Sequence, residues 1–368
     1  MAAGLRYCVP PDAARAAALL LFDTHPSPPY PDAPQMTMHR RSLLALAAGT
    51  LAPTGALLAS GAHAADAYPS HAIRWIVAYP AAGGSDFLAR QIAPQMARQM
   101  GQSVVIDNRP GAAGIVGTEV AAKAPGDGYT ILTGDNGAMV FHTALYKSLP
   151  YNPSDFVPLG FMASFPLILV VNPNAGFTNA RQWLEDVKRN PGKFSYASPG
   201  AGSPHHLAME LLKERTGSFI VHVPYRGTAA AMNDVISGQV PIMIVDTAAG
   251  LAQIRGGKVK ALAVLSKHRI AQLPDVPTLS EVGADRNLKD FDANAWQGLF
   301  APKGTPPAIA NRLTEEMRKA ILTPEVKKRL EDFGLEVAPS DGPQLAAFIA
   351  KETVFWHKLI QDRHLSLD

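Results

Sequence analysis

The amino-acid sequence predicts an α/β protein in which helices cover sheets. Strand patterns and helix patterns alternate along the chain from Ile73 onward, which is typical of α/β layers. Apart from a turn at Pro125, the polar glycine loops each follow a strand, and two of them, at 80–86 and 198–206, lead into a helix. Ligands of open α/β sheets bind beyond the carboxyl ends of the strands. Two such sheets facing each other therefore predict a ligand cleft with polar walls.

The first strand–loop–helix unit begins with the apolar run Ile73–Val77, which suits a buried strand. Gly83 and Gly84 let the backbone turn tightly and approach a ligand. Ser85 or Asp86 is expected to cap the helix that follows, whose apolar residues recur every fourth position. The N–H groups and the dipole of this helix favour an anion above the end of the strand.

The rest of the chain repeats short apolar strands, glycine or proline turns and helices with one apolar face. The expected strands cover 103–106, 129–133, 166–172, 194–197, 219–223, 241–245, 258–265 and 295–301. Two expected helices end near 124 and at 237. The others cover 177–188, 207–215, 307–322, 324–332 and 344–360. A second strand–glycine–helix unit therefore surrounds the loop at 198–206.

Composition excludes some classes of protein. The 368 residues are 47% hydrophobic and 18% charged, with a formal net charge of +3. Length and hydrophobic content suffice for two domains. Lysines and arginines are scattered along the chain, so we expect no nucleic-acid partner.

The N-terminal segment has the features of an export signal. His39-Arg40-Arg41 precedes an apolar run at 43–58, and Ala62-His63-Ala64 forms a small-residue cleavage site. We interpret 36–64 as a signal peptide and 1–35 as an extension ahead of the true start. The two arginines also allow the twin-arginine route as the weaker alternative to general export.

Two consequences follow from this export signal. Translation is expected to start at Met36 or Met38. Cys8 is the one cysteine, so a mature chain has no disulfide and no cysteine for a lipid anchor. We expect a soluble periplasmic monomer.

The chemical groups indicate no catalytic or metal centre. His205 and His206 are adjacent and point to different sides, and no further cluster has metal-ligand spacing. Ser198 follows a strand, but Tyr196 stands where an esterase elbow needs glycine. Asp86 and Asp246 could form an acid–base pair, although Asp86 is more simply a helix cap. We expect no catalytic residue, no metal and no cofactor.

A set of short motifs occurs in order along the chain. They are YPAAGGSD at 79–86, DNRPGA at 107–112, GDGYT at 126–130, LPY at 149–151, VPYRG at 223–227, PDVPT at 274–278 and GLFAP at 298–302. Together they resemble the Bug family, the TctC-like periplasmic receptors of tripartite tricarboxylate transporters. The resemblance runs from about Tyr68 to the C-terminal helix. The first glycine loop of this family often carries proline where this chain has Ala82, a departure expected to leave the amide positions unchanged.

The resemblance implies a type II periplasmic-binding-protein fold, with two α/β lobes joined by two crossing strands. One lobe would comprise 68–164 and 294–368, and the other 165–293. It implies a small carboxylate held through backbone amides, hydroxyls and waters, and a transporter or sensor as the membrane partner. The ligand-lining residues carried over are Tyr79, Gly83, Gly84, Ser85, Asp86, Thr133, Asn136, Ser164, Ser198, Gly200, Gly202, Ser203, His206, Tyr225 and Asp246.

Two other functions compete with a binding receptor. An exported hydrolase or isomerase would use Ser198 or Asp86 in the same cleft. A ligand-sensing domain of a regulator shares the lobe architecture, but the export signal and the lack of a helix-turn-helix pattern argue against it. Dicarboxylates, tricarboxylates, amino acids, aromatic acids and nicotinate-like molecules all remain open as ligands.

Overall fold

The computed structural model describes residues 68–283 and 287–367. These residues fall within one unit of the chain, Leu58–Asp368. The extension expected at 1–35, the signal peptide expected at 36–64 and Cys8 lie outside the described residues, so those expectations stay predictions.

The first sheet contains β1, the first strand of the described chain, and five further strands. Its strands are β1 (Ile73–Val77), β2 (Val104–Asn108), β3 (Thr130–Asp135), β9 (Asn294–Pro302), β4 (Phe156–Val171) and β10 (Glu336–Val337). β1 lies between β2 and β3 and is parallel to both. β9 is antiparallel to β3, and β4 is antiparallel to β9 and to β10. The carboxyl ends of the three parallel strands therefore meet at one edge.

The second sheet uses the other half of β4. Its further strands are β5 (Ser195–Ser198), β6 (Val221–Pro224), β7 (Ile242–Asp246) and β8 (Lys260–Val264). β5 is parallel to β6 and to β7, while β4 is antiparallel to β7 and β8. The loops after β5 and β7 thus leave the sheet at the same edge, as the sequence predicted for a ligand site.

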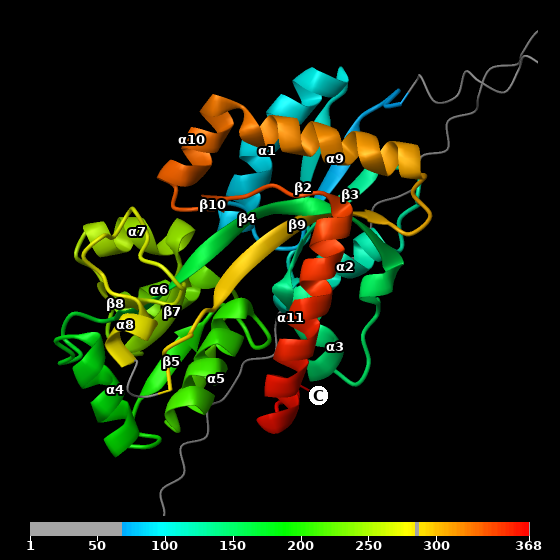
Figure 1. Cartoon of the computed structure of the whole chain (residues 1–368). Helices are drawn as coiled ribbons and strands as arrows, with labels where there is room; N and C mark the ends of the chain where they lie inside the picture. The colour runs from blue at the N-terminus through cyan, green and yellow to red at the C-terminus, as the bar shows by residue number, and fades with distance from the viewer. Residues whose placement is uncertain (1–67, 284–286, 368) are drawn as a thin grey trace, which may run out of the picture. The chain divides into compact units, whose positions relative to one another are not determined.

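Two long strands connect the two sheets. The part of β4 up to Pro166 pairs with β9, and the part from Leu167 onward pairs with β7 and β8. The chain enters β9 directly from the second sheet, where the Ala293 N–H donates to the Leu265 carbonyl at 3.0 Å. Figure 1 shows β4 and β9 running side by side. The expected two-lobe α/β fold with two crossing strands is confirmed.

Helices cover these sheets. They are α1 (Gly84–Met100), η1 (Ala112–Gly114), α2 (Ile115–Ala122), η2 (Gly137–Phe141), α3 (His142–Leu145), η3 (Pro153–Asp155), α4 (Ala180–Arg189), α5 (Pro204–Thr216), α6 (Thr228–Ile236), α7 (Thr247–Arg255), α8 (Leu279–Gly283), α9 (Pro307–Leu322), α10 (Pro324–Asp332) and α11 (Gly342–Asp362). Residues 134–137, which follow the strand expected at 129–133, form the end of β3 and the start of the π-helical turn η2. Similarly, α7 starts directly after β7.

The core confirms the apolar pattern of the first unit. Trp75, Leu88, Ile92 and Met96 are fully buried, and they place the first helix against the first sheet. In β4, Leu167, Leu169 and Val171 pack into one core while Ile168 and Val170 pack into another. Because successive residues of a strand face opposite sides, β4 is buried on both faces over this stretch.

Candidate ligand-binding site

The loop before α1 is held by the Asp86 carboxylate. This group accepts hydrogen bonds from the Ala82 N–H at 2.9 Å, from Arg90 Nε at 2.8 Å and from Asn108 Nδ2 at 3.0 Å. Burial alone would raise the pKa of Asp86, but these three bonds and the charge of Arg90 bring it below its usual value. The carboxylate therefore shapes the loop, and its acceptor capacity is largely used.

The expectation that Ser85 or Asp86 caps α1 is wrong. Gly83 occupies the N-cap position, and its lack of a side chain leaves α1 without a side-chain cap among the described residues. The Ser85 hydroxyl instead accepts from the Gln297 amide of β9. The first N–H groups of a helix have no partner within the helix. Those of α1 are therefore open to an outside acceptor.

Ala82 gives this loop a path that proline cannot follow. Its φ is 64°, whereas the proline ring fixes φ near −65°. Its N–H also donates to Asp86, and proline has no such donor. The expectation that replacing the family's proline leaves the amide positions unchanged is therefore wrong for this loop.

The start of α1 lies against the second sheet. A Cβ built on Gly84 would be 2.9 Å from the Phe165 ring and 3.3 Å from the Cβ of Ala248. Phe165 belongs to the crossing strand β4, and Ala248 to the first turn of α7. This close approach requires glycine at position 84. It brings the N-termini of α1 and α7 together.

Asp246 links the start of α7 to the start of α5. As the N-cap of α7 it accepts from the Ala249 N–H at 2.9 Å, and its other oxygen lies 3.2 Å from His205 Nε2. Burial would raise the pKa of Asp246, but the bond and charge of His205 and the Ala249 N–H bring it below its usual value. The start of α7 is thus in contact with the starts of both α1 and α5, and the positive ends of the helix dipoles favour an anion there.

The loop before α5 meets the first sheet as well. Ser203 caps α5 by accepting from the His206 N–H at 3.3 Å. Gly202, with φ of 79°, donates its N–H to His206 Nδ1 at 3.1 Å. A Cβ built on Gly137 in η2 would be 3.5 Å from the Gly202 carbonyl oxygen. Gly200 similarly comes against Ala113 of η1, with 3.9 Å between a Cβ built on Gly200 and that of Ala113.

Asp135 is a site residue that the sequence analysis did not select. The Tyr79 hydroxyl donates to its carboxylate, and the Ala138 N–H donates to it at 2.9 Å. Burial raises the pKa of Asp135, opposed in part by these bonds and by the charge of His205. Its position at the end of a strand, between the selected Thr133 and Asn136, was a signal that could have found it.

Ser198 contacts His222 as a catalytic serine contacts its general base, but His222 is a weak base. Its Oγ lies 2.6 Å from His222 Nε2 and donates to the Gly200 carbonyl at 3.1 Å. The His222 ring is stacked between Tyr196 and His206. Burial, together with the nearby charges of His206 and Lys213, lowers the pKa of His222 to about 3. The alternative of an Asp86–Asp246 acid–base pair gains no support either, since each carboxylate bonds to its own neighbours.

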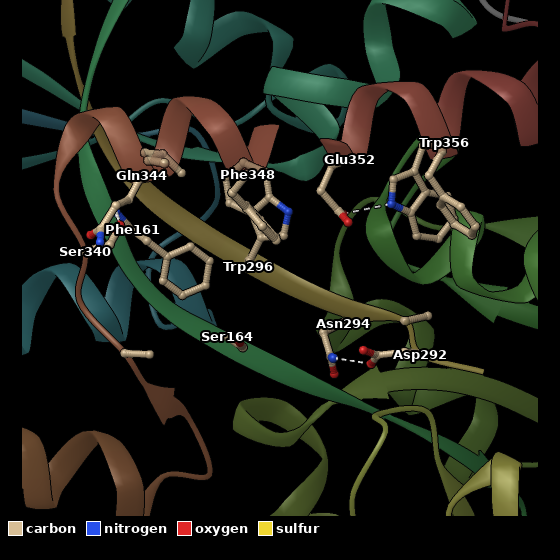
Figure 2. Close-up of a pocket in the computed structure, with 14 residues that line it drawn as sticks. Phe161, Ser164, Asp292, Asn294, Trp296, Ser340, Gln344, Phe348, Glu352 and Trp356 are labelled. Atoms are coloured by element: carbon tan, nitrogen blue, oxygen red, sulfur yellow. Dashed lines mark hydrogen bonds between the residues drawn. The ribbon is translucent and has the colours of Figure 1, made fainter. Parts of the chain in front are cut away.

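Four further selected side chains are engaged elsewhere. The Thr133 hydroxyl accepts from the Trp75 indole at 2.7 Å, and the Asn136 amide donates to the Asn294 carbonyl at 3.0 Å. The Tyr225 hydroxyl donates to Asp234 at 2.6 Å. Ser164 lines a separate cavity between β4 and α11 (Figure 2). The first three of these side chains hold strands and loops in place, and Ser164 flanks the crossing strand β4.

Two searches of the described residues returned nothing. Among residues 68–283 and 287–367, no cluster of three or more histidine, cysteine or acidic side chains is arranged to hold a metal ion. Within the same ranges, no helix combines the length and apolar character needed to cross a membrane.

The fold and the three converging helix starts define a two-lobe solute-binding protein. The model of the tripartite tricarboxylate transporter family receptor, TctC, matches residues 88–365, and the chain belongs to this family. A UPF0065 protein from the tcbD–tcbE intergenic region of Pseudomonas sp. strain P51 is 41% identical over 82% of this chain and 89% of its own. Protein BugT of Bordetella pertussis is 35% identical over 81% and 91%.

Solved structures agree with this assignment. The periplasmic binding protein BugD is 34% identical, with a TM-score of 0.75, and is covered completely by 82% of this chain. A Rhodopseudomonas palustris protein with adipate has a TM-score of 0.77 at 28% identity, with 82% of this chain and 100% of that chain covered. MatC from the same species, with bound malate, has a TM-score of 0.72 at 29% identity, with 80% and 100% covered.

Proposed function

We propose that this chain is a periplasmic receptor that captures a small dicarboxylate and delivers it to the membrane subunits of a tripartite tricarboxylate transporter. Membership of the receptor family supports the role in transport. Two neighbours of the same fold were solved with malate and with adipate, which are both dicarboxylates. A dicarboxylate is therefore the ligand class to test first.

The convergence of α1, α5 and α7 carries this proposal. α5 and α7 begin with side-chain caps, Ser203 and Asp246, whereas Gly83 gives α1 none. A ligand carboxylate supplies the oxygen acceptor that the α1 amides lack, in the way that helix N-termini bind anions elsewhere. The hydrolase alternative has no comparable support, because the base beside Ser198 has a pKa of about 3.

A thermal-shift screen of mono-, di- and tricarboxylates against the matching amides tests the ligand class. A ligand at a hundred times its Kd stabilises by about 2.7 kcal/mol. At about 2.1 cal/mol/K of unfolding entropy per residue, this raises Tm by roughly 4 °C for a chain of this size. We expect at least one dicarboxylate to give this shift and its amide to give none. Equal shifts from acids and amides would exclude an anion site.

A pair of neighbouring glycine variants tests where the ligand sits. Gly84→Val places methyl groups against Phe165 and Ala248, so it should push the start of α1 away from α7 and abolish carboxylate binding. Gly83→Ala is the control, because a Cβ there makes an ordinary 3.4 Å contact with the Pro80 carbonyl. Unchanged affinity in Gly84→Val, with the variant folded, would place the ligand elsewhere.

A further inference from the structure

A cavity lies away from the starts of α1, α5 and α7. It has a volume of about 400 Å³ and lies between the crossing strands β4 and β9 and the helix α11 (Figure 2). Cavities of this size hold small molecules in other proteins. Phe165 faces α1, whereas its neighbour Ser164 lines this cavity, so the two sites use opposite faces of β4.

Aromatic rings form one wall of the cavity. The ring centroids of Phe161 and Trp296 lie 6.2 Å apart, those of Phe161 and Phe348 5.6 Å, and those of Trp296 and Phe348 5.5 Å. Each of the three rings therefore contacts the other two. Figure 2 shows them grouped beneath α11. Such a wall offers π-faces, which attract cations as well as apolar groups.

Carboxylates supply the charge of the cavity. Glu352 and Asp292 line it, and the ion pairs found among the described residues include neither of them. Glu352 accepts from the Trp356 indole at 2.9 Å, and Asp292 from the Asn294 amide at 2.8 Å. Burial raises the pKa of Glu352, and the nearby Asp292 adds to this effect, so a cation beside Glu352 would favour its charged form. Two unpaired carboxylates beside aromatic rings disfavour an anion and favour an organic cation.

One buried donor points to a ligand that also carries an oxygen. Trp296 is 2% exposed, and its indole N–H has no acceptor within hydrogen-bond distance among the described residues, although it lies close enough to Glu352 to lower the pKa of that carboxyl. A buried donor without a well-placed acceptor is destabilising. In Figure 2 this nitrogen lies on the cavity side, toward Glu352. A hydroxyl or ether oxygen on the ligand would satisfy it.

We propose that the cavity between the crossing strands and α11 binds a small organic ammonium cation bearing an oxygen acceptor, of the size and chemistry of choline. The cation packs on the rings of Phe161, Trp296 and Phe348 and faces the carboxylates of Glu352 and Asp292. The ligand oxygen accepts from the Trp296 indole. This site is separate from the proposed carboxylate site.

Calorimetric titration of the protein with choline tests this proposal. The matched probe is the neutral carbon analogue of choline, in which a quaternary carbon replaces the nitrogen. Choline should bind about tenfold more tightly than this analogue, because cation–π attraction in a desolvated site favours the charged ligand. Equal affinities, or no binding of either compound, would overturn the proposal.

Variants locate the binding. Glu352→Gln keeps an acceptor for Trp356, and Phe348→Leu keeps apolar volume, yet each should weaken choline binding about tenfold. Glu315→Gln on α9 removes a charge that pairs with Lys319 instead, and it should bind choline as wild type does. Gly84→Val should also leave choline binding intact. Wild-type affinity in folded Glu352→Gln, or loss of choline binding in Gly84→Val, would contradict the assignment.

Discussion

At the scale of single residues, the candidate site is built from backbone positions that other side chains hold in place. Asp86 fixes the loop before α1, and Asp246 caps α7 while it contacts His205. Gly84 lets α1 approach Phe165. Donors of the protein thus bond to the carboxylates, which would otherwise repel an anion. We therefore expect the backbone amides to bind the ligand.

Ala82 offers the sharpest test at this scale. Ala82→Pro cannot keep φ at 64° and loses the hydrogen bond to Asp86, so we expect a loss of about 3 kcal/mol or a reshaped loop, with carboxylate binding abolished. Ala82→Gly keeps both features and should change stability by less than about 1 kcal/mol. Urea unfolding and a carboxylate titration measure these effects. A proline variant that unfolds and binds as wild type does would contradict the described loop.

Sequence reasoning predicted the two glycine loops, but it did not predict the partners of individual side chains. The glycine loops at 80–86 and 198–206 follow the carboxyl ends of strands in the two sheets, and both lie against the start of α7, through Gly84 and His205. Which side chain caps, bonds or faces a cavity depends on neighbours distant in sequence. Ser85 bonds to Gln297, and Asn136 to Asn294. No local sequence pattern predicts these partners.

At the scale of elements, the start of α7 depends on Asp246. Asp246→Ala removes the cap and leaves His205 without its carboxylate, so we expect a loss of about 2–3 kcal/mol at pH 7. Asp246→Asn retains a capping oxygen and should lose about half as much. Urea unfolding of both variants checks the order. Equal losses would show that the cap contributes little.

The pH dependence of this effect has a definite sign. The pKa of Asp246 is lowered in the folded state, so its contribution is present above its ordinary pKa of 3.8 and is lost as the pH falls through the folded value. The deficit of Asp246→Ala should therefore shrink below about pH 4. A deficit that grows on acidification would contradict the assignment.

Elements were predicted best where the apolar pattern is long. The expected helices at 307–322 and 324–332 match α9 and α10 residue for residue. Shorter elements follow strands closely: α7 starts directly after β7, and η2 starts one residue after β3, so little sequence separates each from the strand pattern. β10 has two residues and exists through its pairing with β4. Tertiary contacts of that kind leave little local signal.

At the scale of the whole molecule, three histidines make folding sensitive to acid. Burial lowers the pKa of His142 to about 4, and it is the largest contribution lowering that of His206 to about 4 and that of His222 to about 3. In the unfolded chain these histidines bind protons near pH 6.5, whereas in the folded chain they do so only near pH 3–4. Their contribution to the free energy of unfolding is therefore full above pH 6.5 and is lost as the pH falls toward 4. Within that range, each histidine lowers the free energy of unfolding by about 1.4 kcal/mol per pH unit.

Chemical unfolding at several pH values between 7 and 4.5 measures this loss. The free energy of unfolding should fall steadily across the range, and His142→Asn should reduce the slope because that side chain does not titrate. His142 suits this test, since its buried Nε2 has no partner among the described residues. A flat profile in the wild type would show that the histidines are protonated in the folded state.

The central claim is that a carboxylate binds where α1, α5 and α7 begin. The most direct measurement is a crystal structure of the protein purified from its own host or grown with the best dicarboxylate from the screen. The account predicts ligand density with one carboxylate within hydrogen-bond distance of the Gly84 and Ser85 amides at the start of α1. Carboxylate density in the cavity beside α11, with the amides of α1 bonded to protein groups, would contradict it.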